Sequence, residues 1–160
     1  MEQPDDSVPI ATLAATATTL ELGISFDDAE LASYPEERPR EEVLSDSFRI
    51  DCGSTSLLCF PFAEGDTKAR AWLRRDSSAW EPAATGVRLG GGYDAKAAQW
   101  QVSLSVDRSL LGIPGGSEAP FNLSVYDNDL TGFTTAYRWV PKDRPTNSQS
   151  GVIDLRKCVR

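Results

Sequence analysis

The chain has 160 residues, a formal net charge of −8 and no histidine. Its length fits one domain, because domains usually hold about 100 to 200 residues, and we expect a tail at 1–9 before a single domain at 10–160. The acidic balance argues against nucleic acid and membrane surfaces as partners, since both attract clustered Lys and Arg. The lack of histidine excludes Ser/His/Asp and Cys/His catalysis and every histidine-bound metal.

Apolar residues alternate with polar ones along much of the chain, which predicts strands that bury one face. The clearest stretches are TLELGISF at 19–26 and QWQVSLSV at 99–106. The alternation places Trp100 on the apolar face beside Val102, so we expect its indole in the core. Further strands are expected at 10–17, 48–52, 57–62, 69–74, 84–89, 121–125, 136–140 and 151–155.

Turn-forming residues separate these strands, as in AEGD at 63–66. GGGY at 90–93 predicts a hairpin turn, since no Lys-Ser/Thr follows it to make a phosphate loop. A single helical turn is expected at 107–112, where Asp107 caps the turn and Gly112 ends it. With about nine or ten short strands and no long helix, the sequence predicts an all-β fold, an antiparallel, jelly-roll-like β-sandwich.

The segment 27–46 breaks the alternation, with eight acidic side chains against two Arg and two Pro. A loop of this length is uncommon in a compact domain and is often functional. A solvated run of charge is the ordinary explanation. If the segment is functional, it offers a surface for a protein partner.

The three cysteines, at 52, 59 and 158, form no CxxC motif, and an odd number cannot pair fully within the chain. Reduced thiols are one interpretation. The other is a single bridge, between Cys52 and Cys59 across a tight hairpin, with one thiol left over. Both are compatible with the spacing.

DNDLTG at 127–132 places two carboxylates two residues apart before a Gly. Oxygen ligands at this spacing suit Ca²⁺, so Ca²⁺ is the candidate cofactor and the candidate ligands are Asp127, Asp129, Asp27 and Asp28. The stretch lacks the later bidentate Glu of an EF-hand, and Asp and Asn also cap turns through their own backbone. A cation site and a capped turn are therefore the two interpretations.

The order of several stretches resembles carbohydrate-binding module family 9 and its DOMON-like relatives. TLELGISFDD is similar to an early family strand that ends in acidic residues, and SDSFRID is similar to a strand that opens with Asp-Ser. QWQVSLSVDRSLLGI, FNLSVYDND and YRWVPKDRPTNSQSGVIDL follow in the family's order. The likeness covers about residues 10–156, although the Glu and IPW that relatives often carry after the 99–106 strand are absent. It implies a β-sandwich that binds sugars without catalysis.

The resemblance also implies which residues contact a sugar. Family members commonly hold one sugar between two Trp, with an Arg and carboxamide or carboxylate groups nearby. Trp139 matches the late Trp, and Arg49 lies where a polar contact is expected, whereas the early Trp has no match. The loop after SFDD offers only Tyr34, and Trp80 in SSAWEP could replace the missing ring. Trp80 and Trp139 could each instead plug an end of the sandwich.

We therefore expect a non-catalytic carbohydrate-binding module that contacts sugar through Trp139, Trp80, Tyr137, Tyr34, Arg49 and Asp127. Sugar C–H faces stack on aromatic rings, and sugar hydroxyls need planar polar groups.

The alternative is a protein-interaction or accessory structural sandwich that has lost the sugar site; the missing early Trp and the acidic segment favour it. Carboxylate-pair catalysis is not expected because the acids cluster in predicted loops, and a haem module is not expected because the chain has one Met and no His.

The expected location of the protein depends on whether it binds carbohydrate. No apolar run approaches the roughly 20 residues that cross a bilayer, and the N-terminal MEQPDDSVPI has no apolar signal core. A removed signal would leave no trace in the chain. If the carbohydrate interpretation holds, we expect a secreted or periplasmic protein.

Overall fold

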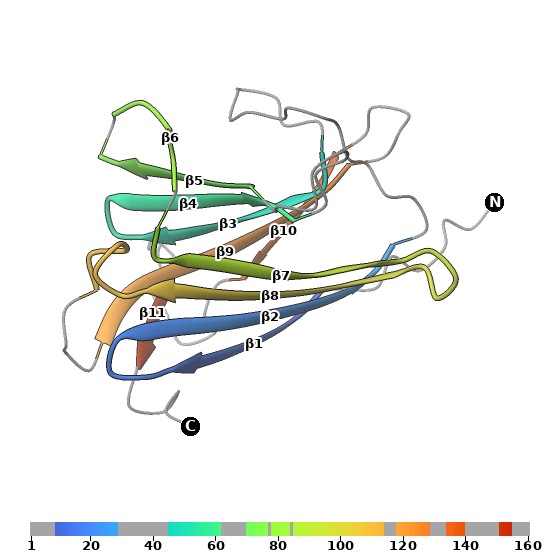
Figure 1. Ribbon diagram of the computed structural model, residues 1–160, viewed down its shortest axis with the longest axis horizontal. Helices are drawn as coiled ribbons and strands as arrows, with labels where there is room; N and C mark the ends of the chain where they lie inside the picture. The colour runs from blue at the N-terminus through green and yellow to red at the C-terminus, as the bar shows by residue number, and fades with distance from the viewer. Residues whose placement is uncertain are drawn as a thin grey trace.

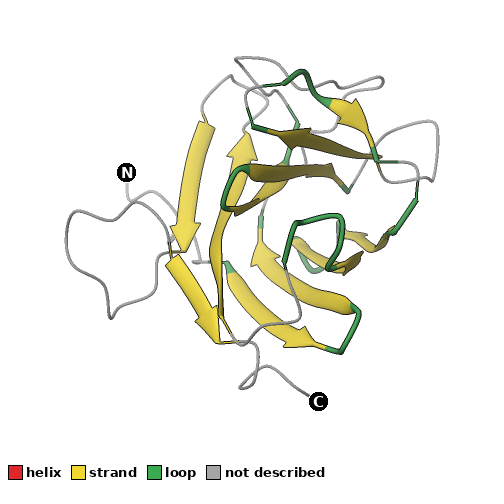
Figure 2. Ribbon diagram, turned by 90° about the vertical axis from the view of Figure 1, so that its left-hand side faces the viewer, coloured by secondary structure: helices red, strands yellow, loops and turns green. Residues whose placement is uncertain are grey.

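The computed structural model describes residues 9–28, 45–61, 70–76, 78–83, 85–113, 118–128, 134–139 and 151–154. These residues form strands joined by turns, and within them no helix has the length and apolar character needed to cross a membrane. Two antiparallel sheets face each other (Figure 1, Figure 2), which confirms the predicted β-sandwich. Tyr34, Asp129 and Cys158 lie outside the described residues, as do most of segment 27–46 and the side chain of Trp139.

The first sheet has four strands within the described residues. Its order is β1 (Ile10–Ala15), β2 (Thr19–Asp27), β8 (Gln99–Asp107) and β7 (Val87–Asp94). The second sheet has seven strands within the same part of the chain. Its main path runs through β10 (Thr134–Trp139), β9 (Glu118–Asn128), β3 (Ser47–Cys52), β4 (Thr55–Phe60), β5 (Arg70–Arg75) and β6 (Glu81–Pro82), and β11 (Gly151–Asp154) pairs with β9.

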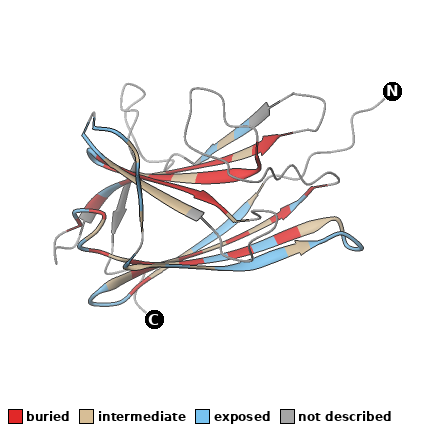
Figure 3. Ribbon diagram, turned by 45° about the horizontal axis from the view of Figure 1, so that its top comes forward, coloured by how far each residue is buried: buried red, intermediate tan, exposed pale blue. Residues whose placement is uncertain are grey.

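A shared core lies between the two sheets. Every second residue of β2 and β8 is buried, and the register pairs core residue with core residue, as with Phe26 and Trp100. The Trp100 side chain is 0% exposed and meets the Phe26 ring edge-on, with 5.3 Å between ring centroids, so its predicted core position is confirmed. Figure 3 shows buried stretches in both layers. Because the inner faces hold the sandwich together, the outer faces and the ends remain for ligands.

The predicted hairpin turn at 90–93 is wrong. These residues continue β7, and the chain reverses at 95–98. Gly91 has a φ of +107°, and a Cβ at this position would lie 2.0 Å from the main-chain oxygen of Gln101. The glycine is therefore needed for a close approach between β7 and β8.

The expected single turn at 107–112 is present as a hydrogen-bonded turn after β8. The main-chain nitrogen of Leu110 donates to the carbonyl of Asp107 at 3.0 Å, and that of Ile113 donates to the carbonyl of Arg108 at 3.0 Å. Gly112 ends the turn with a φ of +65°, as expected for a residue in the left-handed region.

Cys52 and Cys59 are free and buried on the β3–β4 hairpin. The register pairs Cys52 with Thr55 and Cys59 with Phe48, so the two thiols lie toward opposite ends of the hairpin. The interpretation of Cys52 and Cys59 as reduced thiols is therefore confirmed, and the alternative of a disulfide between them is wrong. Burial, with a smaller effect from Asp51, raises the pKa of Cys52 from 9.0 to about 12, and burial also raises the pKa of Cys59.

Candidate functional site

Two residues predicted to bind sugar, Arg49 and Trp80, meet on the outer face of the second sheet. Alternation along β3 turns Ile50 into the core and leaves Arg49 and Asp51 half-buried on the other side. Nε of Arg49 donates to Oδ1 of Asp51 at 2.8 Å, and Oγ of Ser56 donates to the same oxygen at 2.5 Å. This hydrogen-bonded group lies close to the Trp80 indole.

Two guanidinium groups lie over the Trp80 ring. Cζ of Arg74 is 4.6 Å from the ring centroid and Cζ of Arg49 is 5.9 Å from it, which is within the range of cation–π attraction. Nε of Arg74 and Nε1 of Trp72 are buried and make no hydrogen bond within the described residues. An aromatic ring, charged donors and a carboxylate therefore lie together in what we call the Trp80 cluster: Arg49, Asp51, Ser56, Arg74 and Trp80.

Tyr137 lies on the opposite side of the same sheet. It pairs with the core residue Val125, and its ring is 5.4 Å from that of Phe26. Tyr137 also lines a cavity of about 360 Å³ between the start of β1 and the β9–β10 pair, together with Pro9, Ala11, Leu123, Val125, Ala136 and Arg138. Trp139 pairs with Leu123. The sheet therefore separates Tyr137 from Arg49 and Trp80, and the six predicted sugar contacts do not form one site.

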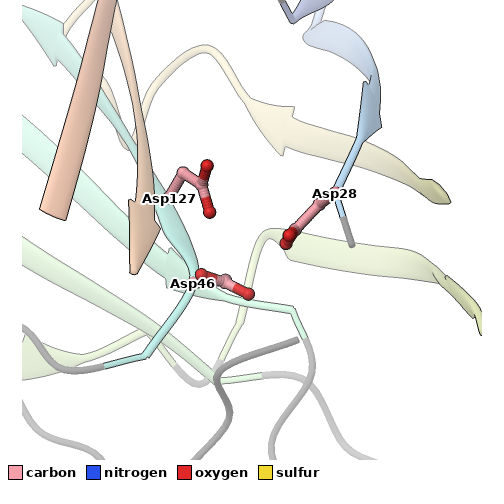
Figure 4. Close-up of side chains that lie close together, drawn as sticks. All are labelled: Asp28, Asp46 and Asp127. Carbon is pink, nitrogen blue, oxygen red and sulfur yellow. The ribbon is translucent and has the colours of Figure 1, made fainter. Parts of the chain in front are cut away.

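Three aspartates lie together at one end of the sandwich, and we call Asp28, Asp46 and Asp127 the carboxylate cluster. One carboxylate oxygen from each lies within 4.8 Å of the others. The residues are 7%, 1% and 8% exposed. Figure 4 shows the three side chains converging from the end of β2, the start of β3 and the end of β9. The cluster therefore connects the two sheets.

Hydrogen bonds fix the backbone around this cluster. The main-chain nitrogen of Asn128 donates to Oδ1 of Asp46 at 2.8 Å. Nδ2 of Asn128 donates to the carbonyl of Ser45 at 2.8 Å, and the hydroxyl of Tyr93 donates to the carbonyl of Asp28 at 2.9 Å. Burial raises the pKa of Tyr93, and the negative charges of Asp28, Asp46 and Asp94 raise it further. Acidic side chains therefore gather around the Tyr93 hydroxyl at this end of the sandwich.

The cluster only partly matches the metal ligands expected from the sequence. Asp28 and Asp127 belong to it, whereas the side chain of Asp27 is exposed and accepts a hydrogen bond from Nε2 of Gln99 at 2.9 Å. Asp46 was not expected. Asp46 reaches the cluster because β3 pairs with β9, which sets Ser47 opposite Tyr126. These segments are about 80 residues apart, so no local sequence pattern predicts their pairing.

Buried carboxylates at this separation repel one another and are costly to remove from water, unless a cation or protons compensate the charge. Ca²⁺ binds oxygens at about 2.3–2.6 Å, so two ligand oxygens across one ion can be roughly 5 Å apart; the 4.8 Å spread fits this. A glycosidase needs two carboxyls that flank a cleft open to a sugar. Because each of these residues is at most 8% exposed, the cluster suits a small ion or protons.

No protein-family model and no curated protein matches the sequence. Solved structures of similar fold do exist. A protein from Bacteroides uniformis, described provisionally as carbohydrate-binding, superposes with a TM-score of 0.63 at 10% identity over 95% of this chain and 84% of that one.

Two structures of a carbohydrate-binding module of family 9 from Caldicellulosiruptor kristjanssonii are also similar. The complex with glucose gives a TM-score of 0.54 at 12% identity, covering 99% of this chain and 79% of that one. The complex with cellotriose gives 0.52 at 12% identity, covering 92% and 75%. The property shared at these identities is the β-sandwich fold.

Proposed function

We propose that the protein is a non-catalytic carbohydrate-binding module and that the Trp80 cluster is its saccharide site. The observation that carries the proposal is the position of Trp80, whose half-buried ring lies beside Arg49 and its hydrogen-bonded partner Asp51 on an outer sheet face. Two structures of similar fold also support the proposal, because they were solved in complex with glucose and with cellotriose.

The chemistry of the Trp80 cluster suits a sugar. The indole offers an apolar surface for sugar C–H groups. Within the described part of the chain, Arg49 bonds to Asp51 through Nε and leaves its Nη groups for a ligand. A guanidinium donates to hydroxyl oxygens in a fixed planar geometry. Asp51 and Ser56 add acceptors beside the ring. These are the few convergent polar groups that give a binding face its orientation and specificity.

The test is calorimetric titration with glucose, cellotriose and a panel of other mono- and oligosaccharides. We expect Trp80→Ala to weaken binding of the recognised sugar at least about tenfold, because stacked aromatic contact is lost. Tyr137→Ala is the matched control, because Tyr137 lines the cavity beside β10 on the other side of the sheet, and this variant should keep the affinity. The opposite pattern would place the site in that cavity, and a folded protein that binds no saccharide would contradict the carbohydrate function.

We further propose that Asp28, Asp46 and Asp127 hold a divalent cation, with Ca²⁺ as the best candidate. Three buried carboxylates provide the hard oxygen ligands that Ca²⁺ prefers, and their spread of 4.8 Å allows one ion to contact all three. Such an ion would neutralise charge that burial otherwise makes unfavourable. It would act as a structural centre that connects the two sheets.

The test of the cation is titration of the metal-free protein with Ca²⁺. Asp46→Asn should abolish or weaken binding by more than about tenfold, because one charged ligand is lost. Asp27→Asn is the matched control, since Asp27 is adjacent in sequence but bonded to Gln99. Equal loss in both variants, or no binding by the parent protein, would contradict the site.

A further inference from the structure

Positive charge gathers on the outer face of the second sheet, although the chain as a whole carries −8. Arg49 and Arg74 both lie over Trp80. The register adds Arg138, which also borders the cavity beside Tyr137 at this edge of the sheet. Arg138 pairs with Ser124, and Ser124 pairs with Arg49. Adjacent strands are about 4.8 Å apart, so Arg138 lies roughly 10 Å from Arg49 in the same cross-strand row. Three cations therefore share one part of the surface.

Within the described residues, most of this positive charge has no acidic partner on the same face of the sheet. Asp51 is paired with Arg49 through a bond of 2.8 Å and also accepts a hydrogen bond from Ser56. Within the described part of the chain, neither Arg74 nor Arg138 takes part in an ion pair. Glu81 pairs with Leu73 and so belongs to the other face of the sheet. The described charges on this face thus sum to an excess of two positive charges.

Arg74 is the residue that most favours an anionic ligand. It is half-buried and stacked on Trp80, and its buried Nε has no hydrogen-bond partner within the described residues, so a ligand would reach the guanidinium through its two Nη groups. A guanidinium held in one place by a ring can bind a carboxylate through two parallel N–H donors, which is its strongest mode of recognition. A neutral sugar would leave this capacity unused.

We propose that the Trp80 cluster selects acidic saccharides, namely sugars with a uronic acid carboxylate. The inference rests on the proposed carbohydrate function and names its ligand class. The carboxylate would bind Arg74, with Arg49 within reach, while the sugar ring lies against the exposed part of the Trp80 indole. Among the described residues of this face, the acidic group beside the cluster is Asp51, whose charge is compensated by Arg49 through the bond of 2.8 Å.

The experiment compares three ligands by calorimetric titration: trigalacturonic acid, its fully methyl-esterified form and neutral cellotriose. We expect the acid to bind about ten- to a hundredfold more tightly than the ester, as a charge-assisted pair contributes. Its affinity should fall as salt is raised. Arg74→Gln should remove the preference for the acid, and Arg74→Lys should restore only part of it because a lysine cannot bind in the bidentate manner.

Arg88→Gln is the matched control, since Arg88 is an exposed arginine on β7 of the other sheet. It should leave the preference for the acid unchanged. If Arg74→Gln and Arg88→Gln weaken this preference equally, the preference depends only on the net charge of the protein, and the inference is overturned. Equal binding of acid and ester, or tighter binding of cellotriose, would also overturn it while leaving the carbohydrate function intact. If no saccharide binds to the folded protein, both proposals are wrong.

Discussion

Trp80 and Trp100 are chemically identical but differ in their surroundings, so their replacement should have opposite consequences. Trp100 is 0% exposed and packs edge-on against Phe26. Trp100→Ala should therefore lower the free energy of unfolding by about 3–5 kcal/mol. Trp80→Ala removes a half-exposed ring and cation–π contacts worth about 0.5–1 kcal/mol each. Urea unfolding checks this, and a larger loss for Trp80 would make it a core residue.

The buried thiols predict how stability changes at alkaline pH. The pKa of Cys52 rises from 9.0 to about 12 on folding, so above pH 9 the folded state holds a proton that the unfolded state loses. The free energy of unfolding should therefore be fully retained below about pH 9 and fall as pH rises toward 12. Chemical unfolding at several pH values measures this. Cys52→Ala should reduce the slope, whereas Cys59 and Tyr93, whose pKa values are also raised, keep the rest of the dependence.

The same burial predicts low reactivity of these thiols. In a Cys158→Ser variant, Cys52 and Cys59 are the two remaining cysteines of the chain. Because the thiolate is the reactive form and burial disfavours it, both should label slowly with a thiol reagent near neutral pH until denaturant is added. Rapid labelling of the folded variant would show that the β3–β4 hairpin opens readily.

The β7–β8 pair depends on one glycine far more than on its neighbour. A Cβ at Gly91 would lie 2.0 Å from the carbonyl oxygen of Gln101, and the φ of +107° disfavours other residues. Gly91→Ala should cost about 1–3 kcal/mol of unfolding free energy or more. Gly92→Ala meets nothing within 4 Å and should be nearly neutral. Thermal unfolding compares the two variants. Equal losses of stability would mean that any added methyl group on this stretch is unfavourable, and that the contact between Gly91 and the main chain of Gln101 is not the cause.

At the level of elements, the sequence predicts what local periodicity determines. The strands at 19–26 and 99–106 follow from alternation because each buries one face along its whole length. The stretch 90–93 misleads because glycine serves both turns and close strand contacts, and the sequence does not distinguish these uses. The two-residue β6 is too short to leave a periodic signal.

The candidate sites required information about pairing between distant strands. Arg49 and Trp80 were expected to bind the same ligand, and the second sheet does bring them together. The aromatic character of Tyr137 suggests a sugar contact, yet β10 presents its side chain to the core side. The sequence does not predict that Asp46 lies near Asp127, because their distance depends on the β3–β9 register. Residue type suggested the chemistry, and register decided which residues meet.

On the scale of the whole molecule, the carboxylate cluster connects the two sheets. Asp28 follows β2 of the first sheet, while Asp46 and Asp127 belong to the second. Asp28 and Asp46 also flank the segment 29–44 on either side. One ion bound to all three would therefore join both sheets and both ends of this segment. Its removal should affect the unfolding of the entire sandwich, since the cluster belongs to no single hairpin.

We therefore expect Ca²⁺ to raise the free energy of unfolding in a saturable way, by about 2.7 kcal/mol when its concentration is a hundred times the dissociation constant. A chelator should reverse the effect, Asp46→Asn should abolish it, and Asp27→Asn should retain it. Urea unfolding with and without Ca²⁺ provides the measurement. If Ca²⁺ has no effect while Asp46→Asn alone stabilises the protein, the cluster is neutralised by protons, because a neutral amide then relieves repulsion that no cation was compensating.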